Sequence, residues 1–129
     1  VMTSNLPGVL GSPATSNTIS MTVNSPVSPA VSIALTTGSN PSCAGTPVTF
    51  TATPTNGGTV PAYQWQVNGT NSGTNSSTFT TSSSITGQIF TCVLTSNAPC
   101  VSPATSTSAV ITMTINPVIN PFFIFFVYN

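Results

Sequence analysis

The chain has 129 residues and contains no Asp, Glu, Lys, Arg or His, whereas about 25% of the residues of an ordinary soluble domain are charged. Catalytic acids and bases, phosphate-binding surfaces and most metal sites depend on these side chains. The composition therefore argues against an enzyme and against a nucleic-acid-binding protein, and it predicts no catalytic site, no metal site and no cofactor.

The remaining composition favours a packed all-β chain. Ser, Thr and Asn account for 55 residues, but hydrophobic residues still make up 39%, which is more than a disordered chain normally carries. Thr, Val, Ile and Phe favour strands, and Pro and Gly supply the breaks between them. No run reaches the roughly 18–20 apolar residues of a membrane helix, so we expect no membrane span. The lack of charge favours self-association.

Alternation of apolar and polar residues predicts six or seven strands, each with one apolar face. In chain order the apolar rows are Val31, Ile33 and Leu35; Val48, Phe50 and Ala52; Tyr63, Trp65 and Val67; Phe79; Phe90, Cys92 and Leu94; and Ile111, Met113 and Ile115. One-sided strands of this number predict two antiparallel sheets packed face to face. The buried core is expected to include Phe50, Tyr63, Trp65, Phe90, Cys92, Ile111 and Met113.

The two ends of the chain repeat each other. Residues 1–5 (VMTSN) match 93–97 (VLTSN), and 19–24 (ISMTVN) match 111–116 (ITMTIN), both at an offset of 92; residues 12–16 (SPATS) recur at 102–106, and Pro29 maps onto Pro121. A period of this length is that of a small sandwich domain and exceeds that of a solenoid repeat. We therefore expect the last two strands of a preceding repeat in 1–24, a complete sandwich in 25–116 and the first strand of a following repeat in 117–129.

Several of these segments resemble a known family. Residues 63–69 (YQWQVNG) and 90–93 (FTCV) resemble the third and sixth strands of an immunoglobulin-like sandwich. Together with 43–54 (CAGTPVTFTATP), 91–97 and 111–115, they are similar to tandem immunoglobulin-like or PKD-like repeats in large surface adhesins of gliding Bacteroidetes and related bacteria. The resemblance covers nearly the whole chain. It implies an immunoglobulin-like fold and an extracellular location at the cell surface.

The sequence also departs from that family. Ala52 stands where the second strand usually carries a cysteine, so Cys92 would face the core without a disulfide partner. Phe90 replaces the tyrosine that normally bonds the backbone at the corner of the sixth strand. Calcium-binding relatives use acidic loops, which this chain lacks.

Cys43 and Cys100 are the disulfide candidates, because the resembling repeats often carry cysteines at both places. In a regular sandwich these two loops lie at opposite ends, so a bond between neighbouring repeats is the alternative. Either bond implies an oxidising, extracellular setting. Cys92 alternates inward and is expected to be a small buried residue. A catalytic thiol is not expected, because no histidine or cation is present to lower its pKa.

Other polar and aromatic residues have two interpretations. Tyr63 and Trp65 could stack on a sugar, but their alternation with Gln64 and Gln66 favours the core. Residues 68–70 (NGT) and 75–77 (NSS) fit the pattern for N-glycosylation. In a bacterial protein they are better interpreted as turn residues.

The C-terminal run contains Phe122, Phe123, Ile124, Phe125, Phe126 and Val127. It is too short for a membrane helix but suits a strand that is buried on both faces. It is expected to begin a following repeat or, in a separate subunit, to add to a neighbouring copy.

The function predicted from these features is that of a non-enzymatic structural repeat. Such repeats would assemble head to tail in a bacterial surface fibre or adhesin, with strand complementation between neighbours as an option. The expected partner is the protein itself. The alternative is an immunoglobulin-like module that binds surface glycans or another surface.

Overall fold

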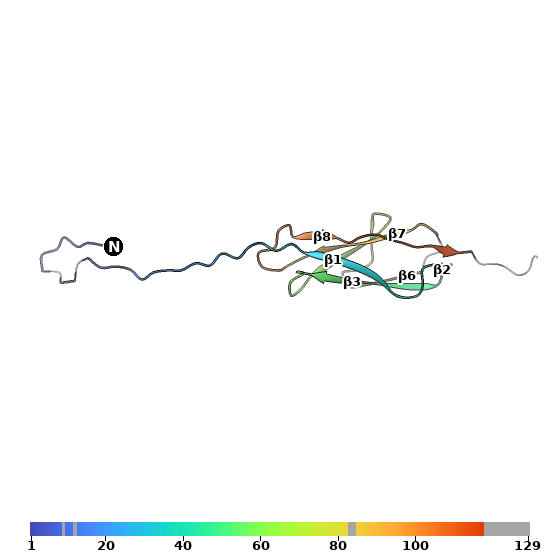
Figure 1. Cartoon of the computed structure of the whole chain (residues 1–129), viewed down its shortest axis with the longest axis horizontal. Helices are drawn as coiled ribbons and strands as arrows, with labels where there is room; N and C mark the ends of the chain where they lie inside the picture. The colour runs from blue at the N-terminus through green and yellow to red at the C-terminus, as the bar shows by residue number, and fades with distance from the viewer. Residues whose placement is uncertain (9, 12, 83–84, 118–129) are drawn as a thin grey trace, which may run out of the picture.

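The computed structural model describes residues 1–8, 10–11, 13–82 and 85–117. Within them the chain is all-β, with ten strands and no helix (Figure 1). In chain order the strands are β1 (Ala30–Thr37), β2 (Ser42–Cys43), β3 (Pro47–Thr55), β4 (Ala62–Val67), β5 (Thr70–Ser72), β6 (Thr78–Ser82), β7 (Ile89–Thr95), β8 (Thr105–Thr107), β9 (Ile111–Thr112) and β10 (Ile115–Asn116).

Two antiparallel sheets form the body of the structure. One has the order β1-β3-β6, and the other has the order β5-β4-β7-β8, with β9 also paired to β7. A third, short sheet joins β10 to β2 in parallel. The predicted all-β class and the arrangement of antiparallel sheets in a sandwich are therefore confirmed.

The core lies between the two main sheets and is built by the alternation of their strands. β3 buries Val48, Phe50 and Ala52, while β7 buries Phe90, Cys92 and Leu94. Because successive side chains of a strand point to opposite faces, each strand supplies every second residue to the core.

An aromatic cluster fills the centre of this core. The rings of Phe50 and Phe90 stack with their centroids 4.6 Å apart, and those of Trp65 and Phe79 stack at 5.6 Å. The Phe50 and Trp65 rings are 6.3 Å apart and tilted. Such ring pairs add about 0.5–1.5 kcal/mol each beyond the burial of their area, so the cluster ties the two sheets together.

Five of the residues expected in the core are completely buried: Phe50, Trp65, Phe90, Cys92 and Met113. The other two, Tyr63 and Ile111, are partly buried and packed against the core. Tyr63 lies near the start of β4 and Ile111 begins the two-residue strand β9. These two side chains therefore lie at the edge of the core.

The last predicted strand, over 111–115, differs from the structure. It divides into β9, which pairs antiparallel with β7, and β10, which pairs parallel with β2. Met113 lies between them, and its backbone bonds to Gly87 and Gln88 instead of a strand. The chain changes partners here, which alternation alone does not indicate.

The segment before the sandwich is extended (Figure 1). Residues 17–26 carry no strand assignment, and their side chains are exposed. The sequence predicted a strand over 19–24, but none of the strands found among the described residues pairs with this segment.

Candidate functional site

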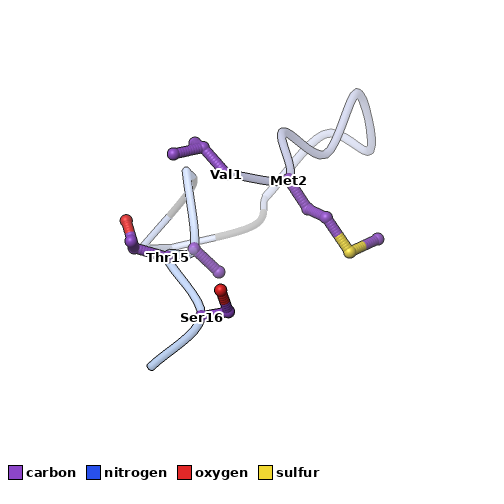
Figure 2. Close-up of a pocket in the computed structure, with 5 residues that line it drawn as sticks. Val1, Met2, Thr15 and Ser16 are labelled. Carbon is purple, nitrogen blue, oxygen red and sulfur yellow. The ribbon is translucent and has the colours of Figure 1, made fainter. Parts of the chain in front are cut away.

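A hollow near the N-terminus is the first place to look for a ligand (Figure 2). It has a volume of about 340 Å³ and is lined by Val1, Met2, Ala14, Thr15 and Ser16. The backbones of Met2 and Ala14 bond to each other in both directions, at 2.9 and 3.0 Å. The hollow is therefore the inner side of a small hairpin.

A hairpin of related sequence occurs inside the sandwich as β7 and β8, but its pairing is shifted by two residues, because Met2 bridges Ala14 and Ala14 corresponds to Ala104 in the matching SPATS segment. Met2 corresponds to Leu94 at the repeat offset, and Leu94 pairs antiparallel with Ser106. Leu94 is 0% exposed, whereas Met2 is 82% exposed. The hollow is thus an exposed counterpart of a surface that the sandwich buries, and none of the side chains that line it is an acid, a base or a thiol.

The described residues contain no group of three or more side chains that could hold a metal ion. They also contain no helix of the length and apolar character needed to cross a bilayer. The remaining candidates are the two ends of the sandwich, where the chain enters and leaves it.

The chain enters the sandwich at Val27. This residue forms a parallel bridge with Val101, in which the Val27 amide donates to the Cys100 carbonyl at 2.9 Å and the Ser102 amide donates to the Val27 carbonyl at 3.0 Å. The first anchored residue is therefore bonded directly to the loop between β7 and β8.

The chain leaves the sandwich through β10, and two side chains bond to residues 112–115, at the start of this strand and just before it. The Asn40 amide donates from Nδ2 to the Thr112 carbonyl at 2.8 Å and accepts at Oδ1 from the Thr114 amide at 2.9 Å. The Thr86 hydroxyl donates to the Ile115 carbonyl at 3.0 Å and accepts from the Ile115 amide at 2.9 Å. Together these four bonds form what we call the exit clamp.

Sequence reasoning missed the exit clamp. The sequence pattern does not single out Asn40 or Thr86, and Asn40 lies more than 70 residues from its partners in the chain. Polar loop residues are common, and no local pattern distinguishes those that bond to a distant strand.

The two disulfide candidates lie at opposite ends of the sandwich. Cys43 pairs with Asn116 where the chain leaves, and the Cys100 carbonyl bonds to Val27 where the chain enters. Figure 1 shows β2 and β8, which lie beside these residues, at the two ends. Both thiols are exposed and free, so the structure does not bring them together.

Cys92 is also free, but it is completely buried. It belongs to the same core cluster as Ala52, the residue at the usual cysteine position of the second strand. Burial raises the pKa of the Cys92 thiol from 9.0 to about 11. Because the thiolate is the reactive form, Cys92 should be inert at neutral pH.

Stability should therefore fall as pH rises from about 9 to about 11, because the native state keeps the Cys92 proton after the unfolded chain has released it. Below pH 9 both states are protonated and this group contributes no slope. Urea unfolding at pH 8, 9, 10 and 11 should show the decline, with a shallower one in Cys92→Ala. The residual slope should come from Tyr63, whose pKa burial also raises. Identical slopes in both proteins would contradict this assignment.

The aromatic pair on β4 is structural. Trp65 is completely buried, and its indole Nε1 donates to the Ser76 carbonyl at 2.9 Å. Tyr63 is partly buried against the core. A ring that stacks on a sugar must be exposed, so Trp65 cannot serve as such a platform.

The two asparagines of the glycosylation-like triplets bond to the backbone. Asn68 Oδ1 accepts from the Ile89 amide at 2.9 Å, and Asn75 Oδ1 accepts from the Tyr63 amide at 2.8 Å. Asn68 also has a positive φ of 51°, a conformation that asparagine tolerates better than most residues. Both side chains therefore hold turns against neighbouring strands.

The predicted strand of Phe122 to Val127 lies outside the described residues. Comparisons of the chain with family models, with curated proteins and with solved structures give no match.

Proposed function

We propose that the chain is an extracellular structural repeat of a bacterial surface fibre or adhesin, in which immunoglobulin-like sandwiches follow one another head to tail. Each sandwich acts as a stiff spacer that carries tension along the fibre. The observation that carries the proposal is an apolar row in residues 19–23 that is exposed here, whereas the corresponding residues of its repeated copy are buried or half-buried.

The row consists of Ile19, Met21 and Val23, which are between 82% and 88% exposed. At the offset of 92, Met21 corresponds to Met113, which is 0% exposed. Ile19 and Val23 correspond to the half-buried Ile111 and Ile115. Burying a side chain of this size is worth about 1.5–3 kcal/mol. The final strand of a second sandwich would expose this row of side chains if the strands that normally cover it were absent.

The order of the strands supports the immunoglobulin-like part of the proposal. β1, β3 and β6 occupy one sheet, and β4 and β7 are neighbours in the other. In immunoglobulin-like sandwiches the first, second and fifth strands likewise share a sheet, and a core Trp lies on the third. Trp65 occupies that position on β4.

The bonding at the two ends supports a mechanical role. Val27 runs parallel to Val101, and β10 runs parallel to β2. Tension applied through the chain would pull each of these segments along its own axis relative to its partner. Several hydrogen bonds then have to break together, because they lie across the direction of pull.

Asn40→Ala is expected to weaken the exit clamp under tension, because it removes the two hydrogen bonds to Thr112 and Thr114, in the segment that leads into β10. A loss of one to two kcal/mol corresponds to roughly 5–30-fold in an equilibrium or rate constant. Unfolding at constant force, measured on single molecules pulled from both ends, should become faster by a factor in this range.

Gln66→Ala is the matched control, because Gln66 lies in β4 and also makes two side-chain hydrogen bonds, with Asn71 and Thr91, neither of which lies where the chain enters or leaves the sandwich. Its unfolding rate under force should stay close to that of the unchanged protein. Equal acceleration by both substitutions would show that the exit clamp does not resist tension, and no acceleration in Asn40→Ala would show the same.

The extracellular location has its own test. Antibodies raised against residues 25–116 should label intact cells, and external protease should remove the signal without lysis. Labelling only after permeabilisation would contradict the proposed location.

The alternative of a glycan-binding module loses its strongest candidate for a sugar-stacking residue, because Trp65 is buried.

A further inference from the structure

We propose that Cys43 of one sandwich and Cys100 of the next form a disulfide across the junction between them. This inference rests on the proposed head-to-tail arrangement. It gives the two exposed thiols a shared role, as a covalent cross-link that locks the angle between successive spacers.

Each of the two thiols lies close to the point where the chain leaves or enters the sandwich. Cys43 lies on β2 directly beside Asn116, the last residue of β10. The Cys100 carbonyl accepts the hydrogen bond of Val27, the first anchored residue of the sandwich. Each cysteine is therefore about one strand spacing, roughly 5 Å, from the point where the chain leaves or enters.

The connection between one sandwich and the next is short. Asn24 corresponds to Asn116 in the repeat, so Ser25 and Pro26 are the residues between the end of one unit and the anchored Val27 of the next. Three peptide steps span at most about 11 Å. The leaving end of one sandwich therefore faces the entering end of the next at close range.

These distances allow a disulfide when both cysteines lie on the same side of the connection. A disulfide needs a Cα separation of about 4.4–6.8 Å. Cys43 and Cys100 each lie about 5 Å from the connecting chain, and the two points that they lie beside are at most about 11 Å apart. When the connection is bent rather than fully extended, the two Cα atoms reach the separation that a disulfide needs. The same two cysteines within one sandwich lie at opposite ends and do not meet.

The conformation of Cys100 provides a matched replacement. Cys100 has a φ of 57°, in the left-handed region that favours glycine. Residues 1–5 align with 93–97, and continuing that register places Gly8, with a φ of 90°, at the position of Cys100. Cys100→Gly should therefore preserve the fold, because the repeat itself uses glycine at this position.

The chemistry needs an oxidant, which a small-molecule disulfide supplies in an extracellular setting. The thiolate of one cysteine attacks that disulfide and releases one small thiol, which leaves a mixed disulfide. The second cysteine then attacks the mixed disulfide and releases the second small thiol. Two protein thiols are oxidised and one small disulfide is reduced to two thiols, so atoms and electrons balance.

The test is a tandem protein in which residues 1–116 are followed directly by 25–129, so that Asn116 is followed by the connection that naturally follows its counterpart Asn24. In the junction variant, the first sandwich carries Cys100→Gly and the second carries Cys43→Ser, so that only the facing pair remains. In the outer variant, the first sandwich carries Cys43→Ser and the second carries Cys100→Gly, so that the remaining pair lies at the far ends. Both are equilibrated in mixtures of oxidised and reduced glutathione.

The junction variant should form an intramolecular disulfide at least tenfold more readily than the outer variant, measured by intact mass and thiol titration. A connection this short gives a high effective concentration of one thiol near the other. Equal formation in the two variants, or none in the junction variant, would overturn the cross-link.

Folding is monitored separately in the same samples, by protection of Cys92 from thiol reagents and by the fluorescence of Trp65. Two folded sandwiches without the cross-link would refute this inference and leave the proposed fibre repeat intact. A tandem protein in which the second sandwich does not fold would refute both.

Discussion

Trp65→Ala is expected to lower the free energy of unfolding by about 3–5 kcal/mol, the range found when a large buried aromatic is truncated. Trp65 is completely buried, and its ring stacks on Phe79 and lies beside Phe50. The substitution would also leave the Ser76 carbonyl without its indole donor. Domains of ordinary stability have about 5–15 kcal/mol in total, so this single change would remove a large share.

Urea unfolding followed by far-ultraviolet circular dichroism measures this loss, because the substitution removes the chain's only tryptophan and with it the fluorescence signal. Trp65→Phe should lose less, since it keeps an aromatic ring in the cluster and removes mainly the bond to Ser76 and part of the volume. Gln66→Ala, on the opposite face of the same strand, should cost under about 1 kcal/mol. A comparable loss in Gln66→Ala would show that β4 does not face the core as described.

Met113→Ala is expected to lower the free energy of unfolding by about 2–5 kcal/mol, because it opens a cavity at a completely buried position. Its repeat counterpart provides the matched control. Met21 is 85% exposed, so Met21→Ala should leave the unfolding transition of this chain unchanged. Thermal and urea unfolding of the two variants give the comparison directly.

The same pair tests the repeat when the preceding sandwich is supplied. In a tandem protein in which residues 25–110 are followed directly by 19–129, residues 19–24 take the place of 111–116 at the end of the first sandwich, and Met21 is expected to be buried like Met113. Its replacement by Ala should then destabilise the first sandwich by the amount seen for Met113→Ala. If this replacement left the free energy of unfolding of the first sandwich unchanged, residues 19–24 and 111–116 would not be structurally equivalent.

The strand pattern was predictable where a strand has one face in the core and one in solvent. The alternation of Tyr63 and Trp65 with Gln64 and Gln66 fixed the orientation of β4, and that of Phe90 and Cys92 did so for β7. The pattern could not locate the division between β9 and β10. That division depends on a change of partner strand around Met113, which is set by contacts far away in the chain.

The polar bonds at the ends were also beyond sequence reasoning. The exit clamp joins Asn40 and Thr86 to a strand that lies 29–74 residues away. Ser108 is a further example: its hydroxyl accepts from the Cys92 amide at 3.0 Å, inside the fold. In a Ser- and Thr-rich chain, the few hydroxyls that bond to buried backbone look the same as the many that face water.

The most direct test of the head-to-tail account is the intact mass of the protein isolated from its source, combined with peptide sequencing after chymotryptic digestion. The account predicts a mass far above 13.1 kDa, with segments like 63–69 and 111–116 recurring at intervals of about 92 residues. A mature protein of 13.1 kDa would contradict a covalent succession of sandwiches. The exposed row of Ile19, Met21 and Val23 would then have to be covered by a separate copy.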